Sequence, residues 1–324
     1  MEIIRLQIPN NLKKESLPPL SLAIGYFDGV HIGHRTVMLT AKSTAEEKGL
    51  KSGVMTFDPS PKAVLGDNPE EVKYITLLND KIQLIEQLGF DYLFIVPFTR
   101  TLANFSPEEF INNYIIQLNV QHLVAGFDYT YGKFGKGTMD NIETYSKGRF
   151  SHQTIGKVAK NDLKISSTLI RDLIQKGHVD EVPDYLGRFY SVCGFVIHGK
   201  KRGKQLGFPT ANLMIHERYI LPVNGVYIVR LLVDGKWEEG VASIGYNPTF
   251  NEQQTERFIE VHLIDFDRDI YGKPIILEWR KRLRDELKFD VIDELVKQIG
   301  KDKQDAIEYF NKQYALLSPS FLQK

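Results

Sequence analysis

The sequence predicts an α/β domain built on a Rossmann-like parallel sheet, followed by a small antiparallel β-barrel with a C-terminal helix. The chain has 324 residues, enough for two domains that each bury a core of their own. Before residue 186, apolar strand-like runs alternate with helical segments, which is typical of a parallel sheet with helices on both faces. After it, short strands follow one another with turn residues between them, which indicates a barrel. We therefore predict two domains, residues 1–186 and 187–324.

The regular pattern of the first domain begins at residue 20. Strands are predicted at 20–27, 52–57, 92–97 and 122–125, and helices at 33–48, 79–88, 106–118 and over a stretch that includes 167–176. The third helix has a clear start signal, because Ser106 can cap it, Pro107 suits its first position and Glu109 can complete a capping box. Helices thus separate successive strands, as a parallel sheet requires.

The second domain is predicted to be mostly strand. Strands are expected at 190–197, 225–233, 240–245, 258–266 and 275–283, and an amphipathic helix at 291–313 is expected to pack on the barrel. Cys193 is the only cysteine, so it forms no internal disulfide, and its place in the first of these strands predicts core packing.

The charge balance excludes a strong global electrostatic field. Lys plus Arg and Asp plus Glu both number 41, so no overall field recruits nucleic acid or a membrane surface. The N-terminus lacks a basic region followed by an apolar core, and no apolar run approaches the roughly 20 residues that span a bilayer. We expect a cytoplasmic protein without nucleic-acid or membrane partners, and the sequence leaves its oligomeric state open.

One turn combines two imidazoles with three glycines where a predicted strand ends and a helix begins. It reads Gly25-Tyr-Phe-Asp-Gly-Val-His31-Ile-Gly33-His34. The free N–H groups and positive dipole end of a helix attract phosphate, and glycines let the phosphate approach the backbone. Imidazole N–H groups can stabilise charge on a phosphorus under attack. The sequence therefore predicts a nucleotide-phosphate site, with an ordinary turn bearing two surface histidines as the alternative.

A second cluster starts the helix near residue 167. It reads Lys164-Ile-Ser166-Ser167-Thr168-Leu-Ile-Arg171. Its hydroxyls can cap the helix, and Arg171, one turn further on, can form a bidentate contact with phosphate. Capping alone would explain the hydroxyls, but beside His31 and His34 they favour a phosphate site with two walls.

Further short motifs continue along both halves. They are Thr56-Phe-Asp-Pro59, Ala125-Gly-Phe-Asp128-Tyr-Thr-Tyr-Gly132, Gly199-Lys-Lys-Arg-Gly203, Gly207-Phe-Pro-Thr210-Ala-Asn212, Asn224-Gly-Val-Tyr227, Gly245-Tyr-Asn-Pro-Thr249, Glu260-Val-His-Leu and Tyr271-Gly272. In order and spacing, the motifs resemble the bacterial bifunctional riboflavin kinase/FAD synthetase family over almost the whole chain. The resemblance implies an adenylyltransferase module in the first half and a kinase module in the second.

For the kinase module, the resemblance implies phosphorylation of riboflavin to FMN by ATP. Glu260 matches the catalytic base, and Thr210 and Asn212 match the residues that hold Mg²⁺ against the ATP phosphates. Arg284 and Glu286 match the segment that closes over the flavin. A flap over the nucleotide would contain Gly199, Lys201, Gly203 and Gly207. An exposed Glu260 and a solvated basic turn are the structural alternatives.

For the adenylyltransferase module, the resemblance implies attack of the FMN phosphate on the α-phosphorus of ATP, giving FAD and pyrophosphate. His31 and His34 would stabilise the transition state. The phosphates and the rest of ATP would be held by Gly25, Phe27, Gly33, Asp128, Ser167, Thr168 and Arg171. A turn-forming role explains Asp128 nearly as well.

The chain departs from the family at a few positions, and three other functions share part of the pattern. Ser60 stands where His is common, Tyr129 and Tyr131 where Phe is usual, and Pro183 interrupts a stretch that is usually helical. An aminoacyl-tRNA synthetase shares the His-x-Gly-His motif, but it would add a Lys-Met-Ser-Lys-Ser-like loop and a basic surface. A flavin-binding regulator would have lost the residues assigned to the chemistry. A third alternative, that only one of the two modules is active, stays open.

Overall fold

Parallel pairing of apolar strands organises the first part of the chain. The computed structural model describes residues 1–160, 162–199, 207–246 and 257–317, and it divides into two compact units, Met1–Ile170 and Arg171–Lys324. The first unit holds a sheet of six strands in its described residues, and all neighbouring pairs of the sheet are parallel. The strands, in sheet order, are β1 (Glu2–Arg5), β4 (Tyr92–Pro97), β3 (Lys51–Asp58), β2 (Leu20–Ile24), β5 (Val120–Gly126) and β8 (Ser151–Ile155).

The strand order creates a switch point next to β2. From β2 the chain proceeds to β3 and β4 on one side, whereas β5 and β8 are added on the other side. In open α/β sheets, ligands bind at such a point, beyond the carboxyl ends of the strands. The glycines Gly25 and Gly126 stand at the ends of β2 and β5, so this edge is where we expect the site.

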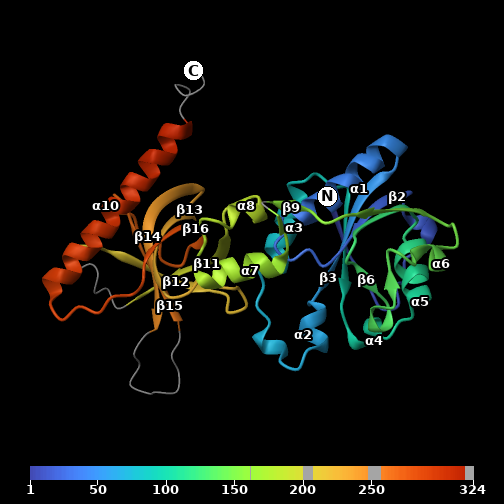
Figure 1. The fold of residues 1–324 in the computed structure, drawn as a ribbon, viewed down its shortest axis with the longest axis horizontal. Coiled ribbons are helices and arrows are strands. Elements are labelled where there is room, and N and C mark those ends of the chain that lie inside the picture. The colour runs from blue at the N-terminus through green and yellow to red at the C-terminus, as the bar shows by residue number, and fades with distance from the viewer. Residues whose placement is uncertain (161, 200–206, 247–256, 318–324) are drawn as a thin grey trace. The chain divides into compact units, whose positions relative to one another are not determined.

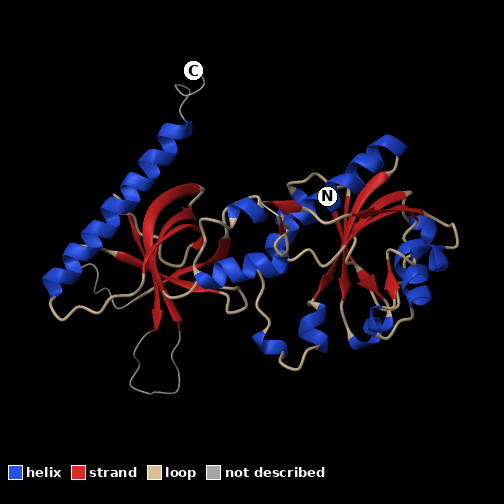
Figure 2. Cartoon of the chain, viewed as in Figure 1, coloured by secondary structure: helices blue, strands red, loops and turns tan. Residues whose placement is uncertain are grey.

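Helices and short hairpins connect these strands (Figure 2). The α-helices are α1 (Ile32–Lys48), α2 (Pro61–Leu65), α3 (Leu78–Glu86), α4 (Arg100–Ala103), α5 (Pro107–Ile111), α6 (Ile142–Ser146) and α7 (Ser167–Lys176). The short helices are η1 (Lys14–Ser16), η2 (Pro69–Glu71), the π-helical η3 (Asn112–Ile116) and η4 (Lys133–Gly135). The small hairpins pair β6 (Thr130–Tyr131) with β7 (Gly137–Thr138) and β9 (Ala159–Lys160) with β10 (Leu163–Lys164).

Alternation along each central strand builds two cores, one on each face of the sheet. Leu22 and Ile24 belong to the core that includes α5 and η3, whereas Ala23 between them joins the core formed with α1 and α3. The same division separates Phe94 from Leu93 in β4. A strand buried on both faces is apolar at every position, which is why these runs were recognisable in the sequence.

The second unit contains a closed antiparallel barrel. Its strands, in barrel order, are β11 (Ser191–Ile197), β12 (Thr210–Ile215), β15 (Arg257–Leu263), β14 (Lys236–Tyr246), β13 (Gly225–Val233) and β16 (Pro274–Arg284). The helix α8 (Pro183–Leu186) precedes the barrel, and α10 (Ile292–Leu317) runs along its outside (Figure 1). Ala306 and Phe310 of α10 are buried against Ile228 of β13, so this helix completes the apolar packing of the barrel.

The predicted fold class is confirmed, and the sequence missed particular elements. The edge strands β1 and β8 were not predicted, because their residues are mostly exposed and lack an apolar run. The helix predicted at 106–118 continues as the π-helical η3 after Ile111, and its capping box is present. Cys193 is half-buried on the face of β11 opposite the buried Val192 and Val196. The prediction that Cys193 packs in the core is therefore wrong.

Candidate active sites

The turn between β2 and α1 is shaped by the side chain of His31. His31 is the N-cap of α1, and its Nδ1 atom accepts a hydrogen bond of 3.1 Å from the backbone N–H of His34. Because Nδ1 acts as an acceptor, the neutral imidazole carries its proton on Nε2. The cap therefore fixes His31 in the tautomer that can donate a hydrogen bond through Nε2.

The two imidazoles lie against each other at the start of α1. Their ring centroids are 3.5 Å apart and the rings are nearly parallel. Burial, followed by the charges of His31 and Lys81, holds the pKa of His34 well below its usual value. His34 is therefore neutral at pH 7, and its buried Nδ1 atom has no hydrogen-bond partner among the described residues.

Close backbone approach explains the glycine that opens the turn. A Cβ atom on Gly25 would lie 2.6 Å from Cε1 of the Phe27 ring, which real structures do not tolerate. The ring of Phe27 is buried and meets His34 edge to face, with centroids 5.3 Å apart. Gly25 thus lets Phe27 fold back beneath the histidine pair.

The start of α7 forms a second wall beside this turn. Ser166 acts as the cap, since its Oγ accepts from the backbone N–H of Leu169 at 3.2 Å. Ser167 does something else: its hydroxyl donates to the carbonyl oxygen of Asp28 at 2.9 Å. The two motifs that the sequence analysis paired are therefore joined by a hydrogen bond.

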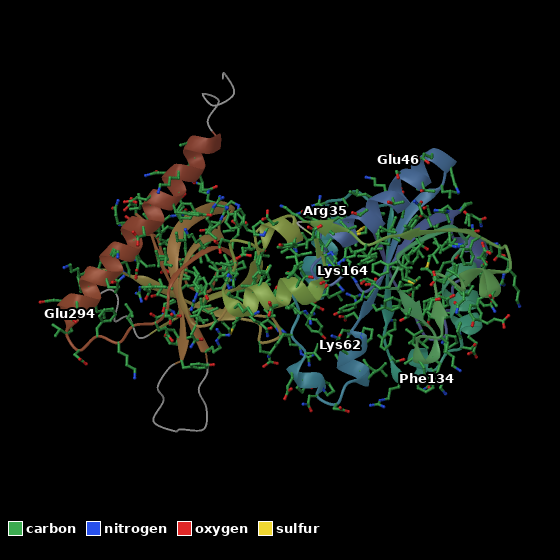
Figure 3. All side chains as sticks on the ribbon, viewed as in Figure 1. Arg35, Glu46, Lys62, Phe134, Lys164 and Glu294 are labelled. Carbon is green, nitrogen blue, oxygen red and sulfur yellow. The ribbon has the colours of Figure 1, made fainter. Side chains whose placement is uncertain are left out.

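A cavity of about 840 Å³ lies between these walls, within the first unit. The predicted residues that line it are Gly25, Phe27, His31, Gly33, His34, Asp128, Ser167 and Thr168. Arg171, on α7 after Thr168, is not a lining residue. Asp128 forms an ion pair of 2.7 Å with Lys164, a cavity residue labelled in Figure 3. Most of the predicted set therefore surrounds one space.

Many of the side chains that line this cavity are aromatic. Its lining includes Phe57, Phe98, Phe110, Tyr129, Tyr131 and the largely exposed Phe134. The rings of Tyr129 and Tyr131 are stacked with centroids 6.1 Å apart, and burial raises the pKa of both phenols. Apolar walls with a few polar groups suit a flat organic ligand.

Ser60, which stands where His is common in the family, has a local structural role, because its side chain caps α2.

In the second unit, strand register brings the predicted kinase residues together. Asn212 of β12 stands opposite Glu260 of β15, and Thr210 stands opposite His262. Residues two apart on a strand share a face, so the four side chains occupy one patch of the barrel wall. Thr210, Glu260 and His262 line a second cavity of about 320 Å³, which Asn212 does not line.

Gly199 follows β11 and lies next to Asn212. A Cβ atom at this position would fall 2.0 Å from Nδ2 of Asn212, so any larger residue at Gly199 would displace the Asn212 amide. Gly207 precedes β12 with a φ of +82°. Lys201 and Gly203 lie outside the described residues.

The predicted flavin residues are held by partners from other elements. Arg284 forms a bidentate pair with the buried Asp302 of α10, with Nε–Oδ1 and Nη2–Oδ2 distances of 3.0 and 2.7 Å. Glu286 accepts a hydrogen bond of 3.2 Å from the Asn224 side chain. Arg284, Glu286 and Asp302 all line the second cavity.

Sequence reasoning missed two residues that support these sites. Asp302 gave no signal, because one acidic residue in a polar helix is ordinary. Lys81 was detectable in principle: it stands four positions before the buried Ile85, on the apolar side of α3, where a charge is unexpected.

A cavity at the switch point of a parallel sheet, joined in one chain to a barrel whose wall carries a patch of polar side chains, defines a protein class with two modules, each with its own cavity. The FAD synthetase family model matches residues 13–169, and the riboflavin kinase family model matches residues 186–310. The chain belongs to the bifunctional riboflavin kinase/FMN adenylyltransferase family.

Curated relatives share this organisation over almost their full length. The bifunctional riboflavin kinase/FMN adenylyltransferase of Bacillus subtilis is 50% identical over 96% of this chain and 99% of that protein. The protein of the same description from Listeria monocytogenes is 45% identical over 90% of this chain and 92% of its own. The protein of the same description from Escherichia coli K12 is 33% identical over 93% of this chain and 96% of that protein.

A solved structure shares the fold under a different description. The chain described as a macrolide-efflux protein from Streptococcus pneumoniae is 33% identical, with a TM-score of 0.85 and coverage of 94% of this chain and 98% of its own. That description belongs to the other protein. No helix in the described part of the present chain combines the length and the apolar character that a membrane crossing needs.

Proposed function

We propose that this chain phosphorylates riboflavin to FMN at the barrel and adenylylates FMN to FAD in the cavity of the first unit. The observation that carries the proposal is the grouping of the assigned residues: most of those assigned to the adenylyl transfer line one cavity of the first unit, and Thr210, Glu260, Arg284 and Glu286 line one cavity of the second. The match of one family model to each half supports the same division. We also propose that the functional boundary lies between residues 186 and 187.

In the adenylyl transfer, an oxygen of the FMN phosphate forms a bond to the α-phosphorus of ATP. The bond between that phosphorus and the bridging oxygen breaks, and its electron pair leaves with pyrophosphate. The reaction needs in-line positioning and stabilisation of phosphate charge rather than a covalent protein group. His31 offers its Nε2 proton, and the neutral His34 lies stacked beside it at the positive end of α1.

The leaving pyrophosphate would be held at the opposite wall. Thr168 lines the cavity, and the hydroxyl of Ser167 links that wall to the turn. Arg171 follows one helical turn later on α7 and would bind a β- or γ-phosphate oxygen. Gly25, Phe27 and Gly33 would shape the turn against the nucleotide, while the Asp128–Lys164 pair stands at the cavity wall.

In the kinase step, the 5′-hydroxyl of riboflavin attacks the γ-phosphorus of ATP and ADP leaves. Glu260 would accept the hydroxyl proton as the general base. Its position on β15, directly opposite Asn212 and at the second cavity, supports this assignment. Arg284 and Glu286 would contact the flavin, and Gly199, Lys201, Gly203 and Gly207 would belong to a flap over the nucleotide.

The residues near Glu260 fit a magnesium ion. Thr210 and Asn212 supply hard oxygen donors, and the register places a carboxylate opposite the amide of Asn212. Mg²⁺ takes few protein ligands and keeps phosphate oxygens and waters around it, so the two donors Thr210 and Asn212 would suffice to hold it against the ATP phosphates. When bound, Mg²⁺ would neutralise charge on the ATP phosphates.

The substrates also support a location for the chain. ATP is an intracellular substrate, and a single cysteine suits a reducing compartment. We therefore propose a cytoplasmic enzyme. The zero net charge gives no reason to expect nucleic acid as a partner.

The test is incubation of the purified chain with riboflavin, ATP and Mg²⁺, followed by chromatographic separation of riboflavin, FMN and FAD. We expect FMN to rise first and FAD to follow. A parallel reaction started from FMN reports the adenylyl transfer alone. FMN without FAD would reduce the proposal to a kinase, and FAD only from supplied FMN would reduce it to an adenylyltransferase. Binding of flavin without either product would favour a regulator.

A further inference from the structure

A lysine is buried directly behind the histidine turn, on a helix that carries none of the assigned site residues. Lys81 belongs to α3 and is only 2% exposed. A charged amine is rarely placed there, because removing it from water is costly unless its donors are satisfied. The position therefore requires an explanation beyond packing.

The ammonium group of Lys81 is satisfied by the turn itself. It donates 2.8 Å to the carbonyl oxygen of Tyr26 and 3.2 Å to the hydroxyl of Thr56 at the end of β3. The Thr56 hydroxyl in turn donates to the same Tyr26 carbonyl at 2.9 Å. Lys81 also lies 4.2 Å from the centroid of the Tyr26 ring, a cation–π distance. A single side chain thus binds the backbone, the ring and the neighbouring strand.

The backbone that follows Tyr26 needs such support. Phe27 and Val30 have φ values of +56° and +44°, in a region that costs free energy for residues with a side chain. A turn of this kind persists only where its surroundings fix it. Here it leads straight to the His31 cap of α1.

The segment before α3 holds the other side of the same turn. The carboxylate of Asp28 accepts the backbone N–H groups of Ile75 and Thr76, both at 3.1 Å. The Thr76 hydroxyl accepts from the N–H of Gly29 at 3.0 Å. Lys81 therefore completes a clamp in which α3 and its preceding residues fix the turn from Tyr26 to Gly29.

We propose that Lys81 is a positioning residue for the adenylyl transfer, whose buried ammonium group clamps the Tyr26 carbonyl and the Thr56 hydroxyl and so fixes the turn that presents His31 and His34. The inference rests on the proposed function of that cavity. Lys81 contacts no predicted substrate position itself and acts through the turn.

The surrounding charges agree with this role. Burial lowers the pKa of Lys81 to about 8, while Asp28 and Asp58 oppose that shift, so the amine is mostly protonated at pH 7. Its charge is one cause of the lowered pKa of His34, after burial and the charge of His31. Tyr26 itself is buried beside Asp28, Asp58 and Tyr74, which all act on its phenol. Lys81 thus also helps to keep His34 neutral.

The experiment compares Lys81→Met, which keeps an unbranched side chain one atom shorter and removes the charge, with Lys81→Arg, which keeps a cationic donor. For Lys81→Met we expect the kcat of FAD formation from supplied FMN to fall about 10- to 100-fold, as a small displacement of catalytic groups does. Riboflavin phosphorylation by the same molecules should stay within about twofold, as an internal standard. Lys81→Arg should recover part of the loss.

A second readout separates positioning from general stability. NMR titration of the His34 imidazole, assigned with His34→Gln, should give a higher pKa in Lys81→Met than in the parent, because a nearby positive charge is gone. The pKa should not rise in Lys81→Arg.

The matched control is Lys42→Met. Lys42 is a half-buried lysine of α1 that also donates to a backbone carbonyl, that of Leu88 at 2.8 Å, but it does not touch the turn. It should leave FAD formation unchanged. Equal FAD formation by Lys81→Met and Lys42→Met would overturn the proposal.

If Lys81→Met does not fold, Thr56→Val tests the same clamp, because it removes the hydroxyl and keeps the shape. We expect a severalfold loss of FAD formation, restored by Thr56→Ser, and no loss would refute the clamp. A parent chain that makes no FAD would contradict the proposed function instead.

Discussion

Glu260 and Asn212 face each other across two antiparallel strands, although 48 positions separate them in the chain. At the residue scale, other predicted site residues also lie in pairs: in the first unit, Nδ1 of His31 accepts from the backbone N–H of His34, and Ser167 donates to the carbonyl of Asp28. Each pair contains at least one residue that the sequence singled out.

Replacing the proposed kinase base tests whether the two reactions use separate sites. Glu260→Gln keeps the shape of the side chain but cannot accept the riboflavin proton, so FMN formation should fall about 10²- to 10⁴-fold. FAD formation from supplied FMN should continue at the parent rate. Chromatography of both reactions measures this, with Glu294→Gln, an exposed position on α10 labelled in Figure 3, as the control. Loss of both activities together would argue against two sites.

Replacing His31 tests the adenylyl centre. His31→Ala removes the Nε2 donor and should lower FAD formation about 100-fold or more, so that the reaction stops at FMN. His31→Asn should show the same loss with less effect on stability, because asparagine can still cap α1. His152→Ala, on β8 and away from the cavity lining, should change neither product. Undiminished FAD from His31→Asn would remove His31 from the mechanism.

At the scale of elements, helices and strands place these residues from a distance. The switch point between β2 and β5 locates the first cavity, and the register of β12 with β15 places the predicted kinase residues Thr210, Asn212 and Glu260 on one face of the barrel wall. The helix α10 reaches the second cavity through Leu295, Ile299 and Asp302. It therefore acts as part of the site as well as a cover for the barrel.

The ion pair between Arg284 and Asp302 allows a test of whether α10 helps to order the second cavity. Asp302→Asn leaves Arg284 without its carboxylate and should destabilise the second unit by about 3 kcal/mol, the cost of breaking a largely buried pair. Because Arg284 also loses its orientation, we expect KM for riboflavin to rise more than kcat falls. Thermal unfolding and kinase kinetics measure the two effects, and Glu308→Gln on an exposed position of α10 serves as the control. A parent-like melting temperature and KM would show that the pair does not order the site.

At the scale of the whole molecule, each unit has its own core and its own cavity. The compact units meet in sequence at Ile170 and Arg171, and the family models leave residues 170–185 between them. The boundary at residue 186 remains a prediction. Val179, Val182 and Leu186 precede it and are fully buried, so they contribute to stability wherever the functional boundary falls.

Two fragments test the division. We expect residues 187–324 to fold and phosphorylate riboflavin, and residues 171–324 to do the same with a higher melting temperature, because the longer fragment retains buried apolar side chains. Circular dichroism on heating and FMN formation measure both properties, with the full chain as reference. An inactive or insoluble shorter fragment beside an active longer one would place the boundary nearer residue 171.

The sequence by itself determined the fold class, a parallel sheet followed by a barrel, and the motifs that stand at strand ends and helix starts. These are local signals: apolar runs in β3 and β4, the Ser106 capping box, and the glycines beside His31. The edge strands β1 and β8 were not predicted, because their mostly exposed residues carry no such signal.

Only the tertiary structure decided which residues meet. Lys81 reaches the Tyr26 carbonyl across 55 positions, and Arg284 finds Asp302 across 18. Ser167 joins Asp28 across 139 positions. Such contacts are set by sheet register and by the packing of helices on the sheet, which couple distant segments and leave no periodic trace in either one. The sequence therefore predicted the chemistry at the two sites, whereas the fold determined what holds those residues in place.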